Sequence, residues 1–529
     1  MIINSIPVAP DGRARRQKRL QYRWVDAFVA LGVLAAIALG ARFLLGYGAR
    51  IEIAARPADA TVFVRNTTSG ETTEARGALV LDEARPGSYL VRVTRSGYAT
   101  RTATLTLRRG QKRSLTLSLE PLLFTLVVLP NPETARIVVR HLDGGKSYEV
   151  RGAQPARLPA GRLRLSLSSL NKNPLTSELF LDRDTTVSLW LDPKGQLVHA
   201  LGVWKCGPAP KGVAISPDGS EAWVTLLGGS PSVEVYDLKS GVRTAGIALG
   251  RHGAVEVVFS SDGTRAYVSQ METASVYEID VRKKVVIRRF DTESAWTKFL
   301  ALSPDGTKLY ASNWSGNDVS EIDLASGTAT RRIPTVATPR GLFVTRDGKC
   351  LYVAGFGHGE IDRIDLSTGA RTTVFLAGGA IRHLVADERR GYLYASDMAK
   401  DCIWRLNMKT GEVVRWVKTD HKPNTIDISS DGRLLFVSCR GANNPKSYYL
   451  PGPEWGSVLI VDALRGTILD AIVGGNQCTA LDATPDGRHL IFSDFLDNRL
   501  RYYEVPAYEV LLEGKGGRAP SRHADIRKR

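Results

Sequence analysis

Residues 299–331 read FLALSPDGTKLYASNWSGNDVSEIDLASGTATR, and this stretch decides the fold. A short apolar run ends in Ser303-Pro304-Asp305-Gly306, in which proline presets φ, aspartate bonds its own backbone and glycine accepts an unusual dihedral angle. A second run from Lys308 to Asn313 alternates with a period of two, and a third run covers Val319–Leu324. Alternating runs separated by turn residues predict β-strands joined by hairpins.

The same unit recurs along the C-terminal part of the chain. Consecutive turns lie 41 to 44 residues apart, except for a last step of 55 residues. The turn position is occupied in order by Asp218, Asp262, Asp305, Asp347, Glu388, Asp431 and Asp486. A period near 43 residues with four short strands in each unit is typical of propeller blades, so seven units predict a seven-bladed β-propeller.

At these residues the chain resembles the YVTN-repeat (YncE-like) seven-bladed β-propellers. The resemblance covers residues 196–514 and implies the fold. It carries little information on function, because propellers serve as enzymes, receptors and scaffolds.

Composition divides the chain into segments of different charge. The net charge is +17, but residues 1–24, 50–195 and 513–529 carry all of the excess, and residues 196–512 hold 36 basic and 36 acidic side chains. A neutral propeller has no net attraction for a phosphate backbone, which argues against nucleic acid as a partner, although a local basic patch is compatible with this balance.

The N-terminal segment predicts a membrane anchor. Residues 1–24 form a basic tail, and residues 27–47 are apolar except for Arg42. This apolar run is long enough to cross one bilayer, so a transmembrane segment is predicted over 25–48. A cleaved signal peptide is the alternative, but Tyr47-Gly48 does not fit its cleavage site. Six basic residues before the span place the N-terminus in the cytoplasm and the rest across a bacterial inner membrane, in the periplasm.

Two small β domains are predicted between the anchor and the propeller. Residues 50–121 resemble a PEGA domain in Pro57, Ala60, Val62, Val64, Pro86, Gly87, Tyr89, Gly97 and Tyr98. Residues 122–195 resemble a degenerate second copy. The resemblance implies β-sandwich spacers or adhesion units of the cell envelope, without catalytic activity.

Two further features of residues 196–514 concern closure and cysteine pairing. Either Gln196–Lys205 or Tyr508–Gly514 can complete the last blade, and the N-terminal strand is favoured because it precedes an inner strand as outer strands do elsewhere. Cys206 and Cys478 precede inner strands of neighbouring blades, which is compatible with a disulfide or with two buried thiols. The tail 515–529 is predicted to be disordered.

The loops on one face of the propeller differ from blade to blade and carry special side chains, so we expect a ligand there, at the mouth of the central channel. The alternative is that these groups satisfy one another around water. The candidate residues on this face are Lys211, His252, Trp296, Lys298, Asn313, Trp314, Arg340, His358, Arg382, His383, Asp397, Arg440 and Asp494.

The sixth blade carries an insertion on the same face, residues 440–456. It holds Tyr448, Tyr449, Trp455 and an Asn-Asn pair on a loop stiffened by prolines, which is the composition of a recognition surface. A loop that packs on itself and covers the channel mouth is the alternative.

Motifs for catalysis are absent from the sequence, which has no G-x-S-x-G, P-loop or H-E-x-x-H. No catalytic residue, metal or cofactor is predicted. The leading hypothesis is therefore a membrane-anchored envelope scaffold that binds a protein, peptide or glycan without catalysis. An enzyme related to propeller lactonases, lyases or quinoproteins is the alternative, and DNA binding ranks below both.

Overall fold

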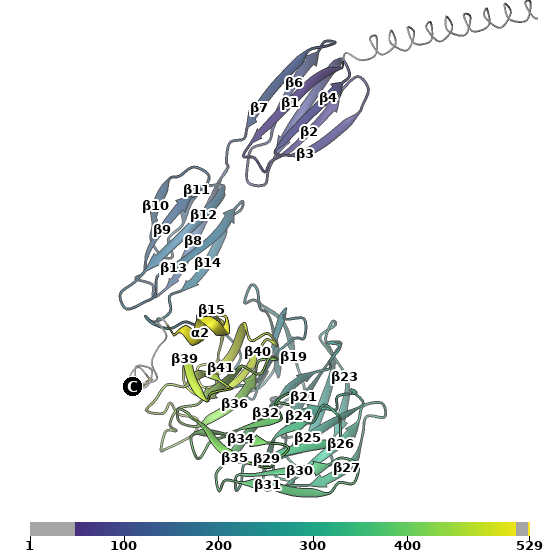
Figure 1. Ribbon diagram of the computed structural model, residues 1–529, viewed down its shortest axis with the longest axis vertical. Coiled ribbons are helices and arrows are strands. Elements are labelled where there is room, and N and C mark those ends of the chain that lie inside the picture. The colour runs from purple at the N-terminus through teal and green to yellow at the C-terminus, as the bar shows by residue number, and fades with distance from the viewer. Residues whose placement is uncertain (1–47, 515–526, 529) are drawn as a thin grey trace, which may run out of the picture. The chain divides into compact units, whose positions relative to one another are not determined.

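The computed structural model describes residues 48–514, 527 and 528 (Figure 1). This part of the chain divides into two compact units, of which the first holds most residues up to 187 and the second holds the propeller. The predicted basic tail 1–24 and nearly all of the predicted anchor 25–48 lie outside the described residues, as do residues 515–526 and 529. Within the described ranges, no helix has the length and apolar character needed to cross a bilayer.

The first β domain is a two-sheet sandwich with the strand orders β4-β1-β7 and β3-β2-β5-β6. Alternate side chains of each strand face the interior, where Ile51, Val62 and Val91 are fully buried. Its strands are β1 (Ala49–Arg56), β2 (Thr61–Asn66), β3 (Thr72–Arg76), β4 (Ala78–Ala84), β5 (Gly87–Thr94), β6 (Arg101–Leu107) and β7 (Lys112–Ser118).

The following seven strands repeat this topology. Their sheet orders are β11-β8-β14 and β10-β9-β12-β13, which are the orders of the first domain with each number raised by seven. In β12, buried and exposed residues alternate without interruption, and Leu163, Leu165 and Leu167 point inward. The strands are β8 (Leu123–Asn131), β9 (Arg136–His141), β10 (Ser147–Val150), β11 (Ala156–Pro159), β12 (Gly161–Ser168), β13 (Leu175–Leu181) and β14 (Thr185–Trp190).

Seven four-stranded antiparallel sheets form the propeller, as the repeat predicts. Hydrophobic clusters lie between neighbouring blades; Tyr267 and Phe290 of the second blade, for example, pack with Leu300 and Leu309 of the third. Each middle strand is therefore buried on both faces.

The strands of the first six blades run in chain order from the channel outward. They are β16 (Pro210–Ile215), β17 (Glu221–Leu226), β18 (Val233–Asp237), β19 (Arg243–Ile247); β20 (Val257–Phe259), β21 (Arg265–Gln270), β22 (Ser275–Asp280), β23 (Val285–Asp291); β24 (Thr297–Leu302), β25 (Lys308–Asn313), β26 (Asp318–Asp323), β27 (Thr328–Pro334); β28 (Pro339–Val344), β29 (Cys350–Gly355), β30 (Glu360–Asp365), β31 (Arg371–Leu376); β32 (Ile381–Asp387), β33 (Tyr392–Asp397), β34 (Cys402–Asn407), β35 (Val413–Lys418); β36 (Pro423–Ile428), β37 (Leu434–Cys439), β38 (Ser457–Asp462), β39 (Thr467–Val473).

The last blade closes the ring with the N-terminal strand, as the sequence favoured. It contains β40 (Cys478–Ala483), β41 (His489–Asp494), β42 (Arg499–Glu504) and, as its outer strand, β15 (His199–Lys205). The alternative segment forms the short helix α2 (Tyr508–Glu513) instead. All five cysteines are buried free thiols, so Cys206 and Cys478 are not joined.

The turns that define the repeat act as local braces. In the third blade the Ser303 hydroxyl donates to Asp305 Oδ1 over 2.5 Å, and the same oxygen accepts the Thr307 amide at 3.1 Å. Gly306 follows with φ of +68°, a left-handed conformation that glycine adopts without strain. These turns are alike in most blades and have a structural role.

Candidate functional site

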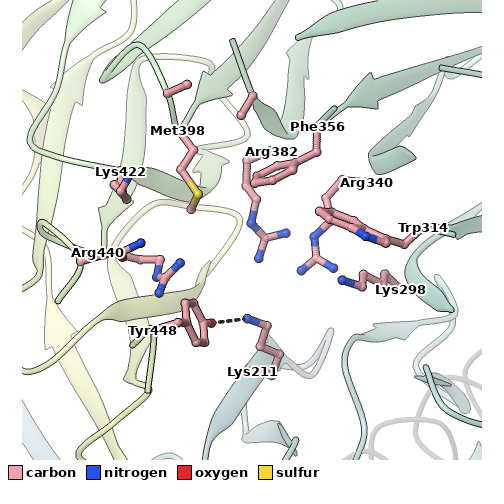
Figure 2. A pocket seen from close by; sticks show the side chains of 13 residues that line it. Lys211, Lys298, Trp314, Arg340, Phe356, Arg382, Met398, Lys422, Arg440 and Tyr448 are labelled. Carbon is pink, nitrogen blue, oxygen red and sulfur yellow. Dashed lines mark hydrogen bonds between the residues drawn. The ribbon is translucent and has the colours of Figure 1, made fainter. Parts of the chain in front are cut away.

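A cavity of about 410 Å³ opens at the channel mouth, on the face where the variable loops gather. Figure 2 shows basic side chains converging on it from several blades. Its volume lies in the range of small-molecule binding sites. The lining residues are Lys211, Lys298, Trp314, Arg340, Phe356, Ala380, Arg382, Met398, Ala399, Lys422, Arg440, Asn443 and Tyr448.

The backbone at the start of the innermost strands aims these side chains into the channel. Lys298, for example, lies in a β-bulge, because the register between β24 and β25 shifts between Thr297 and Leu300. Bulges re-aim a side chain relative to the regular strand. The residue before the strand is Trp296 with φ of +61°, a strained left-handed conformation that Thr338 also adopts before β28.

Hydroxyl groups of the second strand hold the next blade's basic residue in place. Ser269 Oγ donates to the carbonyl oxygen of Lys298 over 2.6 Å, and Ser312 Oγ donates to that of Arg340 over 2.8 Å. Both serines are fully buried. The Ser or Thr that ends the repeated strand motif in most blades therefore links neighbouring blades and fixes the channel-lining backbone.

Three of the basic groups contact neutral partners in the wall. The Lys298 ammonium lies 3.7 Å from the centroid of the Trp314 ring, a cation–π contact. Lys211 Nζ donates to the Tyr448 hydroxyl over 3.2 Å, and Arg440 Nη2 donates to Gln477 Oε1 over 2.6 Å. None of these partners carries a negative charge, so none of them forms an ion pair with the three basic groups.

Arg340 and Arg382 have still fewer partners. They lie at equivalent positions of the neighbouring inner strands β28 and β32 and are only 4% and 8% exposed. Within the described residues, neither guanidinium makes a hydrogen bond or an ion pair, and Arg340 Nε is a buried donor without an acceptor. Figure 2 shows both groups pointing into the cavity. Buried donors of this kind usually have partners.

Mutual repulsion and burial have large effects on acidity here. Burial, followed by the charges of Arg340 and Lys211, lowers the pKa of the Lys298 ammonium to about 6. Burial also lowers the pKa of Lys211 well below its usual value, and that of Arg340 to about 10. Next to this cluster, burial raises the pKa of the Glu256 carboxyl to about 7. The basic groups of this cluster therefore disfavour one another's positive charge.

An arrangement of several desolvated cations around one cavity is suited to binding an anion. No Asp or Glu lines the cavity. Its basic side chains therefore interact strongly only with hydrogen-bond acceptors or negatively charged groups of a ligand. The zero net charge of residues 196–512 does not conflict with this, because no carboxylate lines the cavity: Glu256 lies next to the cluster with a raised pKa, and many other carboxylates lie in the turns of the repeat.

Seven of the residues predicted from sequence line the cavity: Lys211, Lys298, Trp314, Arg340, Arg382, Arg440 and Tyr448. Trp296 and His383 lie beside it. The Trp296 ring is 5.6 Å from Lys298 Nζ, and burial together with the charge of Arg340 lowers the pKa of His383 to about 4.

Three other predicted residues form hydrogen bonds or ion pairs with residues of their own blades. Asn313 Nδ2 donates to Asp318 Oδ1 over 2.8 Å. Asp397 accepts the Ala380 amide at 2.9 Å and the Trp404 indole, and Asp494 forms an ion pair with Arg501. These side chains brace the loops rather than face the cavity.

The remaining predicted residues lie away from the cavity wall. His252 and His358 are exposed, and Tyr449 is 66% exposed and packs edge-on against Tyr448. Trp455 is half-buried, and its amide donates to the carbonyl oxygen of Arg527 over 2.9 Å. Among the residues described by the structure, no group of three or more His, Cys, Asp or Glu could hold a metal ion.

Sequence reasoning missed Phe356, Met398 and Lys422 in the lining, and it noted Asn443 only as part of the Asn-Asn pair of the insertion. Lys422 had a usable signal in the sequence, because it directly precedes an inner strand, as Trp296 does. The structure gives both residues a positive φ, +60° and +61°. Phe356 and Met398 follow the second strands of their blades, and no pattern distinguishes them from residues that close a hairpin.

The insertion 440–456 is fixed at both ends of its course. Its first residue, Arg440, and its middle residue, Tyr448, contribute side chains to the cavity. Near its end, Glu454 binds Arg527 Nη1 at 2.6 Å and His421 Nδ1 at 2.7 Å. Tyr448 is anchored further, since its carbonyl oxygen accepts Gln477 Nε2 at 2.6 Å. This loop therefore both covers part of the mouth and supplies it with side chains.

Comparison with known proteins agrees with the fold. The model of the YncE-like β-propeller matches residues 266–447, and that of the PEGA domain matches residues 49–123. Antigen Lp49 of Leptospira interrogans serogroup Icterohaemorrhagiae serovar copenhageni (strain Fiocruz L1-130) is 32% identical over 327 residues, which cover 59% of this chain and 71% of the antigen. Among solved structures, Kuenenia stuttgartiensis hydrazine synthase aligns with a TM-score of 0.49 and 20% identity, over 56% of this chain and 96% of that one.

Proposed function

This chain belongs to the YncE-like β-propeller proteins that carry a PEGA domain, and from this premise we propose that its propeller is a non-catalytic module that binds an anionic ligand at the channel mouth. One observation carries the proposal. Six basic side chains line one cavity that has no acidic residue in its wall. A ligand that brings negative charge removes their mutual repulsion, whereas a neutral ligand leaves it in place.

The ligand proposed on this ground is an acidic group of an envelope protein, peptide or glycan. The exposed Tyr449 next to the cavity offers contact area to a body larger than the anion itself. We place the propeller outside the cytoplasmic membrane because six basic residues precede the apolar run 27–47. A topology reporter fused after residue 529 tests this location, and activity of the reporter in the cytoplasm would overturn it.

Binding of simple anions tests the function itself. The full-length chain is purified in a non-ionic detergent, because an anionic detergent would compete for a cationic cavity. Calorimetric titrations with sulfate, citrate and a short poly-glutamate peptide are expected to show saturable binding of at least one of them, and to weaken as salt rises.

Variants locate that binding. The double variant Lys211→Gln, Arg440→Gln removes two basic donors from the cavity and is expected to weaken binding by about tenfold or more. Lys409→Gln is the matched control, since Lys409 lies exposed in a turn. If none of the three anions binds, the channel mouth is not an anion site. The same conclusion follows if the double variant binds the anions as tightly as the wild type and the Lys409→Gln control do.

One observation favours an enzyme at the same mouth as a second candidate. The Lys298 amine lines the cavity and has its pKa lowered to about 6, and the Glu256 carboxyl, which does not line the cavity but interacts with Arg340 and Lys211, has its pKa raised to about 7; both are perturbed in the way that acid–base catalysts require. Incubation with a panel of lactones and phosphate esters, followed by product analysis, tests it. Turnover that is lost in Lys298→Met and in Glu256→Gln would replace the binding proposal with a catalytic one.

A further inference from the structure

The two unpartnered arginines say more about the ligand than the charge of the cavity does. Arg340 and Arg382 come from adjacent blades, are almost fully buried and point into the cavity without acceptors (Figure 2). A guanidinium is a rigid fork of donors that matches the spacing of oxygen atoms on carboxylate and phosphoryl groups. Two forks that enter one cavity from adjacent blades define a seat for a group with at least two oxygen atoms.

The positions of the other basic side chains in the cavity indicate whether a carboxylate or a phosphoryl group fits better. Lys298 approaches from the third blade, Lys211 from the first and Arg440 from the sixth, so donors surround the cavity from several directions. A carboxylate presents its two oxygen atoms in one plane and in one direction. A phosphoryl group presents three acceptor oxygens in a tetrahedral arrangement, together with a charge of about −1.5 to −2 near neutral pH.

We propose that the channel mouth binds the phosphoryl group of a phosphate monoester, with the guanidinium groups of Arg340 and Arg382 as its seat. This inference rests on the proposed function, which requires only an anion. Lys298, next to Arg340, and Lys211 bind the remaining oxygen atoms, and the ester oxygen points toward the opening. Trp314, Phe356, Met398 and Tyr448 surround the organic part of the ligand, for which a cavity of about 410 Å³ leaves room.

The backbone supports this seat more firmly than a surface cluster would. The carbonyl oxygen of Arg340 is held by Ser312, and the same hydroxyl accepts the amide of Phe299 at 3.0 Å. One hydroxyl therefore fixes the strand that carries Lys298 relative to the strand that carries Arg340. A phosphodiester, the charge type of a nucleic-acid backbone, has only two free oxygen atoms and one charge, and uses fewer of these donors.

The test compares anions of different shape on the full-length chain. Calorimetric titrations use inorganic phosphate, glycerol 3-phosphate, a dialkyl phosphate diester and succinate. We expect phosphate and the monoester to bind, and the diester and succinate to bind about tenfold or more weakly. Flotation with phosphatidylcholine vesicles, with and without phosphatidic acid, separates a lipid headgroup from a soluble monoester as the source of the phosphoryl group.

Variants assign the binding to the seat. Arg340→Gln and Arg382→Gln are expected to weaken phosphate binding by about tenfold or more each, and Arg282→Gln, which changes an exposed arginine in a turn, is expected to leave it unchanged. Circular dichroism melts establish that each variant is folded. Lys298→Met serves as a second cavity variant if an arginine variant fails to fold, with the same expected loss.

Each outcome separates the two proposals. If succinate or citrate binds in the cavity and phosphate does not, the phosphoryl inference is wrong and the anion-binding function stands. If phosphate binds equally well to Arg340→Gln, Arg382→Gln and the wild type, the seat is wrong. If no anion binds, both proposals fail.

Discussion

The affinity of the channel mouth for sulfate is expected to fall as the pH rises from 6 to 8. Sulfate is the probe because it stays a dianion over this range, whereas phosphate titrates near pH 7. In the free protein the pKa of the Lys298 ammonium is lowered to about 6, because this half-buried group is desolvated in the cavity wall and faces the charges of Arg340 and Lys211. A bound dianion offsets that repulsion and returns the pKa toward the ordinary lysine value, so binding takes up a proton.

The size of the effect follows from these values. At pH 6 about half of the free protein carries a charged Lys298, and at pH 8 only about one molecule in a hundred does, while the complex stays protonated at both pH values. The dissociation constant then rises by up to roughly 50-fold, or about 2.3 kcal/mol, over this range.

The other titrating groups around the cavity either lower the affinity for sulfate further as the pH rises from 6 to 8 or leave it unchanged. Lys211, whose pKa is also lowered, loses its charge as the pH rises, and Glu256, with a pKa of about 7, gains a negative charge. His383, with a pKa of about 4, stays neutral throughout, and Arg340, with a pKa of about 10, stays charged.

Calorimetry in buffers of different ionisation enthalpy measures both the affinity and the proton uptake. In Lys298→Met, sulfate is expected to bind more weakly at pH 6 and with a shallower pH dependence. Circular dichroism at both pH values is the control for folding. A wild-type affinity that is constant or rises between pH 6 and 8, without proton uptake, would refute the electrostatic account of the site.

Three further predictions concern the scaffold around the site. Asp494→Asn removes the fully buried carboxylate and leaves the half-buried Arg501 without its ion-pair partner, so the free energy of unfolding should fall by about 2–4 kcal/mol in urea titrations, and an unchanged midpoint would contradict the bracing role. Ser312→Ala removes the hydroxyl that links the third and fourth blades and should cost about 1–2 kcal/mol in the same assay; no loss would mean that the link is dispensable. Arg527→Ala breaks the contact with Glu454, so limited proteolysis should cut the insertion 440–456 faster while the blades resist, and equal cleavage rates would exclude this tether.

The propeller was predictable because the sequence motifs that specify its turns and strands are local and are repeated in every blade. Each Ser-Pro-Asp-Gly-like turn needs only nearby residues, such as Ser303 and Asp305, and seven copies in phase leave one architecture that closes on itself. The PEGA domain was predictable for the same reason, from turn residues such as Gly97 and from alternating strands. The family comparisons confirm both predictions.

The candidate site was predictable only in part, because it is assembled across blades. Net charge over residues 196–512 is zero, and a sum over sequence does not show that Lys298, Arg340 and Arg382 meet at one end of a channel. Asp397 and Asp494 were expected to face a ligand, yet each accepts backbone amides of the loop before the inner strand of its own blade. The side-chain direction at the end of a strand depends on that loop, and sequence alone does not fix it.

The insertion shows the same limit. Its composition indicated a recognition surface, but the sequence does not show that Tyr448 enters the cavity while Tyr449 remains exposed. The contact between Glu454 and Arg527 joins residues that are far apart in the chain, and neither lies in a recognisable motif.

The central claim is that Arg340 and Arg382 form the seat of a tetrahedral dianion, and anomalous diffraction tests it most directly. Crystals of the full-length chain grown with selenate, a sulfate analogue with strong anomalous scattering, should show a difference peak within hydrogen-bonding distance of both guanidinium groups. The peak should be absent in Arg340→Gln crystals grown in the same way. A cavity without a peak in the wild type, or a carboxylate of the chain itself bound to both arginines, would contradict the claim.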